Sequence, residues 1–335
     1  MRLTITLSVS SLAVGLLLAG CSDASTTPDG GAGADGQAQV NEVSAAVLDD
    51  ADESLASVLD QIGGGTMALN DAPCPAIAGS FTNDPAPSFT ATVTFGTLPE
   101  LTTPWPPAAD DPCLRTGEPG WGDRDRPGGM SGGDAVMKVY LFGRLQKTVT
   151  GTSDADFERS EAVTDLGWVR TASDFTDYVR MQRNGTRGFT RSATGLRARE
   201  DMVTARERKL RGRDLQSTIT GSLEWSFVPV DGATLVSRAS RPSGYITVTG
   251  THHFDGDVPV RTATDDTISI ATVDVTHAVS TTVPLFYDSS CTSVPPRRRI
   301  ASGQLLFTRT GGASARSFTV TWKGCGTEPV RAEVP

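Results

Sequence analysis

The sequence predicts an all-β, mainly antiparallel fold, in which one large curved or half-barrel-like sheet carries a single N-terminal amphipathic helix. The composition favours strands and turns, because the 335 residues include 42 Thr, 35 Gly and 20 Pro. Apolar and polar residues alternate along many segments, as they do in antiparallel sheets with one buried face. Strands do not alternate with long helical patterns, which argues against a βαβ fold. A β-sandwich is the alternative architecture.

The first residues have the pattern of an exported protein. Arg2 precedes an apolar run over residues 12–18, which is too short to span a bilayer as a permanent helix. The run ends in Leu18-Ala19-Gly20-Cys21, which resembles the lipobox of bacterial lipoproteins. The rest of the chain carries no further family motif.

The lipobox resemblance implies a processed and lipidated protein. Residues 1–20 would be removed as a signal peptide, the Cys21 thiol would receive a diacylglycerol, and the new amine would be acylated. The protein would then be lipid-anchored in the cell envelope. With Ser22 following the lipidated residue, the resemblance implies the outer membrane if the host has two membranes, and otherwise the extracellular face of the cell membrane.

A tether and a helix are expected between the anchor and the sheet. Residues 21–40 are mostly small or polar and are expected to form a flexible tether, followed by one mainly-β domain over 41–335. Apolar residues recur at helical spacing over 41–62 and stop at Gly63-Gly64-Gly65, which predicts an amphipathic helix. Its apolar stripe should pack on the sheet, and an apolar ligand would bind in a groove beneath it.

Beyond residue 80 the sequence period changes to two. Strands are predicted over residues 89–95, 136–146, 219–227, 245–254 and 318–322. Asn184-Gly185 predicts a two-residue hairpin turn between residues 178–183 and 186–191. A slip in the alternation predicts a β-bulge near Ala271.

The cysteines predict an oxidising compartment. Apart from Cys21, the chain contains an even number of them: Cys74, Cys113, Cys291 and Cys325. In an exported chain this predicts two disulfides, of which Cys74–Cys113 and Cys291–Cys325 are preferred because shorter loops close at lower entropic cost. The other two connectivities stay open. The Pro- and Gly-rich residues 99–133 are expected to form a long irregular excursion held by Cys113.

Charge is distributed unevenly along the chain, whose formal net charge is −9. Residues 3–114 contain no Lys or Arg, whereas residues 180–213 contain 11 basic residues. The candidates for a patch that binds an anionic partner, such as lipid headgroups or acidic polysaccharide, are Arg183, Arg187, Arg191, Arg206 and Arg208. The alternative is a solvated hairpin. The acidic balance and the 6% aromatic content argue against nucleic-acid binding.

Motifs for catalysis and metal binding are weak. Ser131 lies in a G-x-S-x-G sequence, but a Gly- and Pro-rich loop precedes it and a predicted strand follows, whereas a nucleophile elbow needs a strand before it and a helix after it. His252 and His253 are adjacent on a predicted strand, so they point to opposite faces and do not converge on one metal ion. We therefore predict no catalytic residue, no metal and no cofactor.

The sequence favours a non-enzymatic binding or scaffolding role for a lipid-anchored envelope protein. Its expected partners are the membrane, through the lipid on Cys21, and an anionic or apolar ligand or another envelope protein. A secreted serine hydrolase that uses Ser131 with a histidine is the alternative.

Overall fold

The computed structural model describes most of the chain from residue 74 onward. The described residues are 74–82, 88–97, 111–116, 138–153, 155–171, 178–210, 212–230, 232–236, 242–261, 268–294, 299–310 and 317–334, together with 6–7, 67–68 and five positions between 43 and 55. Cys21, the tether and Ser131 lie outside the described residues. Among the described residues, no helix is long and apolar enough to cross a membrane.

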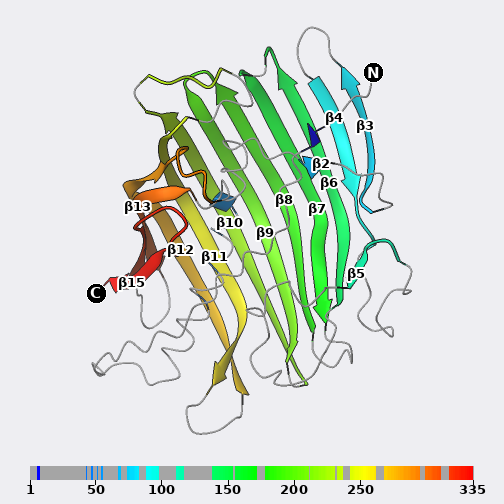
Figure 1. Ribbon diagram of the computed structural model, residues 1–335. Coiled ribbons are helices and arrows are strands. Elements are labelled where there is room, and N and C mark those ends of the chain that lie inside the picture. The colour runs from blue at the N-terminus through cyan, green and yellow to red at the C-terminus, as the bar shows by residue number, and fades with distance from the viewer. Residues whose placement is uncertain are drawn as a thin grey trace.

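Thirteen strands form one open antiparallel sheet (Figure 1). The strands lie side by side in chain order from β3 to β15, except that β5 pairs with one side of β6 beyond the end of β4. They are β3 (Ala76–Thr82), β4 (Ser88–Thr94), β5 (Leu114–Thr116), β6 (Lys138–Gly151), β7 (Phe157–Thr171), β8 (Tyr178–Ser192), β9 (Gly195–Leu210), β10 (Arg213–Pro229), β11 (Gly244–Arg261), β12 (Ile268–Tyr287), β13 (Ile300–Thr310), β14 (Ser317–Trp322) and β15 (Val330–Val334). β1 (Thr6–Leu7) and β2 (Met67–Ala68) form a separate pair. The all-β prediction is confirmed, and one continuous sheet takes the place of the sandwich alternative.

The two faces of the sheet differ in burial. Along β10, buried Ile219, Leu223 and Trp225 alternate with the exposed or half-buried Thr220 and Glu224 and their neighbours. We call the face with the buried side chains the inner face and the opposite one the outer face. The inner face is turned toward the viewer in Figure 1. The period-two pattern thus reports a sheet that is covered on one side only.

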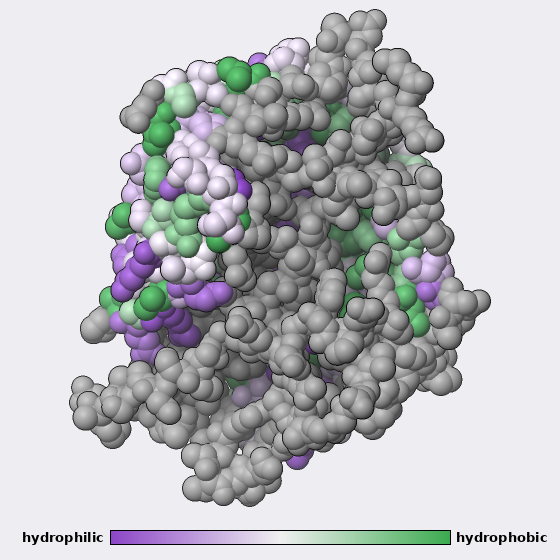
Figure 2. Space-filling model, in the orientation of Figure 1, coloured by the Kyte–Doolittle hydropathy of each residue, from purple (hydrophilic) through white to green (hydrophobic). Residues whose placement is uncertain are grey.

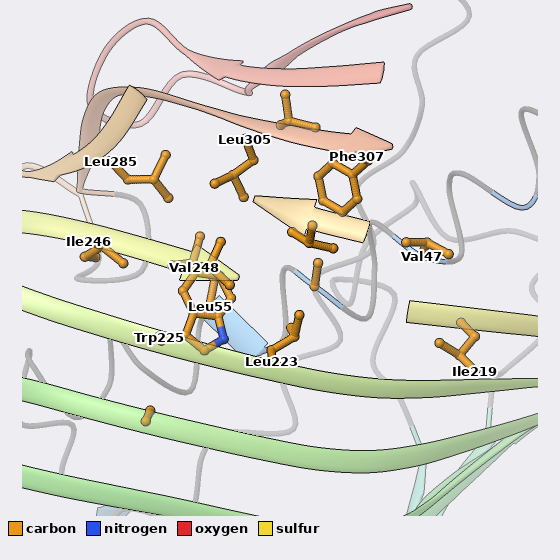
Figure 3. Packing of buried hydrophobic residues seen from close by; sticks show 14 of the residues in the cluster. Val47, Leu55, Ile219, Leu223, Trp225, Ile246, Val248, Leu285, Leu305 and Phe307 are labelled. Atoms are coloured by element: carbon orange, nitrogen blue, oxygen red, sulfur yellow. The ribbon is translucent and has the colours of Figure 1, made fainter. Parts of the chain in front are cut away.

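The predicted N-terminal helix packs on the inner face wherever the chain is described. Val43, Val47, Ala51, Ser54 and Leu55 are helical and at most 5% exposed. Their spacing of about one helical turn places them on one stripe. The apolar members of the stripe belong to the same core cluster as Leu223, Trp225 and Phe307 (Figure 3).

The sheet curls at its C-terminal side. Register shifts interrupt the pairing of β11 with β12 before Thr249, and that of β12 with β13 between Thr281 and Tyr287. Such bulges bend a strand and increase its twist. Leu285 and Leu305 therefore join the same buried cluster as residues of β10 (Figure 3). In the space-filling view, hydrophilic and hydrophobic residues are intermixed along this curled side (Figure 2).

The hairpin turn predicted at Asn184-Gly185 is wrong. Both residues lie inside β8, which is paired with β7 and β9 on its two sides. Gly185 has a φ of 143°, and a Cβ there would lie 2.2 Å from the carbonyl oxygen of Asp201. The Asn184 amide oxygen accepts a hydrogen bond from the Asp165 backbone N–H (2.8 Å) beside a register shift in β7. The Asn-Gly pair therefore accompanies an irregularity between long strands and does not end one.

The bulge predicted near Ala271 is also wrong. β11 and β12 stay in register through this segment. Ala271 lies on the inner face with Val273, whereas Ile270 lies on the outer face and is 38% exposed. The alternation does not slip; an apolar residue simply faces solvent.

Two disulfides join segments near the two edges of the sheet. Cys74 is bonded to Cys113, and Cys291 to Cys325, as predicted. Cys113 is followed directly by β5, so this bond fixes the described part of the 99–133 excursion to the start of β3.

Candidate functional site

The arginines predicted as candidates for an anion-binding patch lie on the inner face. Arg183, Arg187 and Arg191 are 7%, 8% and 1% exposed, and Arg206 and Arg208 are half-buried on the same face of β9. Arg183, Arg187 and Arg191 are therefore too buried to form an exposed patch or part of a solvated hairpin. Sequence spacing alone could not show this, because every second residue of β8 points inward whether it is charged or apolar.

A buried polar network joins the helix to the sheet through Arg187. Its Nε donates to Glu200 Oε2 (2.9 Å), and its Nη2 donates to Glu200 Oε1 (3.3 Å). Ser54 from the helix donates its hydroxyl to Glu200 Oε2 (3.1 Å) and accepts from Trp225 Nε1 (2.9 Å). The place where an apolar ligand was predicted is thus occupied, at these positions, by helix side chains in direct contact with the sheet.

Charges of alternating sign continue this network across neighbouring strands. Lys147, Glu161, Arg187 and Glu200 occupy one cross-strand row from β6 to β9. Arg159 donates to Glu161 and lies over the Phe189 ring, 5.0 Å from its centroid. All five charged residues are buried. Opposite charges at directly paired positions favour this strand register, since buried charges are tolerated when they are paired.

A histidine pair lies farther along the inner face. His252 and His277 are cross-strand partners on β11 and β12, with exposures of 0% and 1%. The His277 ring meets Phe318 edge-on at 5.8 Å. Burial, reinforced by the charges of Arg309, His252 and Arg331, lowers the pKa of His277 to about 4. His253 lies on the outer face beside Thr276, so the predicted divergence of His252 and His253 is confirmed.

His277 makes the stability of the fold dependent on pH. Because its folded pKa lies below the ordinary value of 6.5, the unfolded chain binds the proton first as the pH falls. We expect the free energy of unfolding to fall by up to about 3 kcal/mol between pH 6.5 and about 4, and this contribution to level off below that range. Urea unfolding at a series of pH values measures it. His277→Phe should flatten the slope, whereas His253→Asn should retain it; equal slopes in wild type and His277→Phe would contradict the assignment.

The described residues offer no metal centre. Asp288, Cys291 and Cys325 lie close enough to share an ion, but both sulfur atoms are joined in the disulfide. A thiolate is the form of cysteine that binds metal, so this group has a structural role only.

A polar groove of about 680 Å³ crosses the outer face. Its outward-facing lining comes from six adjacent strands, β6 to β11, and combines hydroxyl and charged side chains: Thr150, Glu158, Ser160, Gly188, Thr190, Arg197, Arg199, Glu224, Ser226, Thr247 and Thr249. The lining also includes four residues whose side chains belong to the inner face: Arg159, Phe189, Ala198 and Trp225. The volume is typical of ligand sites.

Gly188 lies in the floor of this groove and has no evident role in the fold. It pairs in regular register with Ser160 on β7 and Arg199 on β9, and it does not have a positive φ. A Cβ placed there would meet nothing within 4 Å. Glycine inside a strand costs about 0.5–1 kcal/mol relative to alanine, and it marks a bulge, a bend or the close approach of a ligand. The pairing at Gly188 is regular, so neither a bulge nor a bend accounts for the glycine, and the outer face is open at this position.

Sequence reasoning did not find the groove. The one signal in the sequence is the high threonine content, which by itself predicts strands and not a site. Threonines at alternate positions place their hydroxyls on one face, as Thr247 and Thr249 do on β11. Which strands lie beside each other, and hence which of these residues meet, follows only from the topology.

Comparison with known proteins identifies no relative. No protein-family model matches the chain, and no curated protein or solved structure does so.

Proposed function

We propose that this chain is a lipid-anchored protein of the cell envelope that binds a polar ligand in the outer groove and catalyses no reaction. The observation that carries the binding role is the open floor at Gly188, beneath side chains able to donate and accept hydrogen bonds. The groove lies on a sheet whose other face is packed, so the site is held by a rigid support, as binding sites require.

The envelope location rests on two features. Leu18-Ala19-Gly20-Cys21 resembles a lipobox, and the two disulfides are of the kind that persist in oxidising compartments. Lipid on Cys21, followed by the polar residues 22–40, would hold the sheet away from the membrane surface. The membrane is thus one partner and the ligand of the groove the other. In a host with two membranes we place the protein in the outer one.

Cys21→Ser is expected to abolish lipidation and release the protein from the membrane. Several acyl chains at about 0.8 kcal/mol per buried CH₂ make the anchor effectively stable, and serine offers no thiol to receive them. Metabolic labelling with palmitate and fractionation of membranes would measure both effects. Ser22→Ala, which leaves the thiol in place, serves as the control. Palmitate incorporation into Cys21→Ser equal to that of wild type would refute the anchor.

The binding role is tested separately by filling the groove. Gly188→Trp adds an indole where a Cβ meets no neighbour, so the fold should be retained while the site is blocked. Immobilised wild-type and Gly188→Trp proteins would be exposed to a soluble envelope extract, and the retained small molecules and polymers identified by mass spectrometry. Retention by wild type alone supports the groove, and equal retention by both proteins refutes it.

A further inference from the structure

We propose that the outer groove binds a carbohydrate chain that lies across the strands. This inference rests on the binding role proposed above and adds the class of ligand. Three features of the groove point to it: the shape of the groove, the chemistry of its walls, and an exposed aromatic pair next to it.

The groove is elongated across the strands. Its lining comes from six neighbouring strands, and at a strand spacing of about 4.8 Å it extends over about 24 Å. Two cross-strand rows form it, one from Thr150 to Thr247 and one from Ser160 to Thr249. Such a length suits a chain of several sugar units better than a single compact molecule.

The walls match a ligand with many hydroxyl groups. Ser and Thr hydroxyls both donate and accept, arginine only donates, and ionised glutamate only accepts. Arg197 and Arg199 are balanced by Glu158 and Glu224, which disfavours a strongly charged ligand. Some groups are already engaged: Arg199 pairs with Asp201 at 2.9 Å, and Ser226 and Thr247 share a hydrogen bond of 2.7 Å. These bonds hold the walls in place.

An aromatic pair adjoins the groove on the outer face. Tyr245, which is 48% exposed, packs against Phe286 at a ring-centroid distance of 5.3 Å. Tyr245 lies two residues before Thr247, and its cross-strand neighbour Val228, 56% exposed, lies two residues after Ser226. The electron-rich face of an aromatic ring attracts the C–H groups of a sugar ring. Polar walls beside an exposed aromatic ring are the combination that a sugar, with polar edges and apolar faces, requires.

A panel of neutral and uronic-acid-containing oligosaccharides, from monosaccharides to octasaccharides, tests the ligand class. The strongest binder would be titrated by calorimetry into the mature protein with Cys21 replaced by serine. We expect affinity to rise with chain length until the groove is spanned. Gly188→Trp and Tyr245→Ala should each weaken binding about tenfold or more, as expected for central contacts. Equal affinity for the monosaccharide and the longer chains would overturn the inference.

Matched variants separate the groove from the rest of the outer face. Val203→Trp adds the same indole on β9 outside the groove, and Ile270→Ala shortens an exposed apolar residue on β12; neither should change binding. If no oligosaccharide of the panel binds, but wild type and not Gly188→Trp retains another kind of molecule from the envelope extract, the carbohydrate proposal is refuted and the binding role stands. Failure of the panel with no Gly188-dependent retention would remove both.

Discussion

Glu200→Ala is expected to lower the free energy of unfolding by about 3–5 kcal/mol, the cost of removing one partner from a buried ion pair. Glu200 is 7% exposed and accepts two hydrogen bonds from Arg187 and one from Ser54. Alanine removes both carboxylate oxygens and with them all three hydrogen bonds. The guanidinium stays buried, and the Ser54 hydroxyl loses the acceptor that orients it toward Trp225. The change thus weakens both the pairing of β8 with β9 and the packing of the helix on the sheet.

Two further variants identify the cause of the loss. Glu200→Gln keeps the shape and an acceptor oxygen but removes the charge. It should therefore lower the free energy of unfolding by less than Glu200→Ala does. Asp201→Asn, one residue along β9, alters the exposed pair with Arg199 and should change stability little, because solvent screens such pairs. Urea unfolding with the same slope for each protein gives the comparison. A cost for Glu200→Ala no larger than that for Asp201→Asn would mean that the network does not stabilise the fold.

Sheet architecture follows from local pattern to an unusual degree in this chain. Strands such as β4 and β14 alternate so regularly that one face had to be buried, and a meander requires no long crossover. The turn prediction failed because a local signal competed with long-range pairing. Asn184-Gly185 is a good turn sequence, yet pairing with β7 and β9 along the whole of β8 outweighs the turn.

The site was less predictable, because charge and burial are independent in a strand. Arg183, Arg187 and Arg191 recur every four residues, which is compatible with either face, and their count suggested a surface. In the fold they lie on the inner face. Arg187 pairs with Glu200, and Arg191 lies opposite Phe157. Both partners come from neighbouring strands, so the local sequence around each arginine does not reveal them. The groove arises in the same way, from residues on six strands that only the topology brings together.

Removing the Cys74–Cys113 disulfide is expected to lower the free energy of unfolding by about 4 kcal/mol. Without the bond, the unfolded chain regains the conformational entropy that a closed loop of this length denies it. The two residues are separated by 39 positions, and both are buried in a cluster with Tyr140, Phe142 and Val169. Replacing both with alanine therefore also removes sulfur atoms from a packed site. In the described part of the chain, β3 pairs only with β4 and β5 only with β6, and the bond joins the start of β3 to the start of β5.

The second disulfide supplies the matched control for this prediction. Cys291–Cys325 spans 34 residues, so the entropic term is nearly the same, but both cysteines are only half-buried and leave no core site empty. If chain entropy dominates, the two double-alanine variants should lose similar free energy in denaturant unfolding. If packing contributes, the Cys74/Cys113 variant should be the less stable of the two. A Cys74/Cys113 variant as stable as wild type would show that pairing with β4 and β6 alone holds this edge, and that the bond serves another purpose than stability.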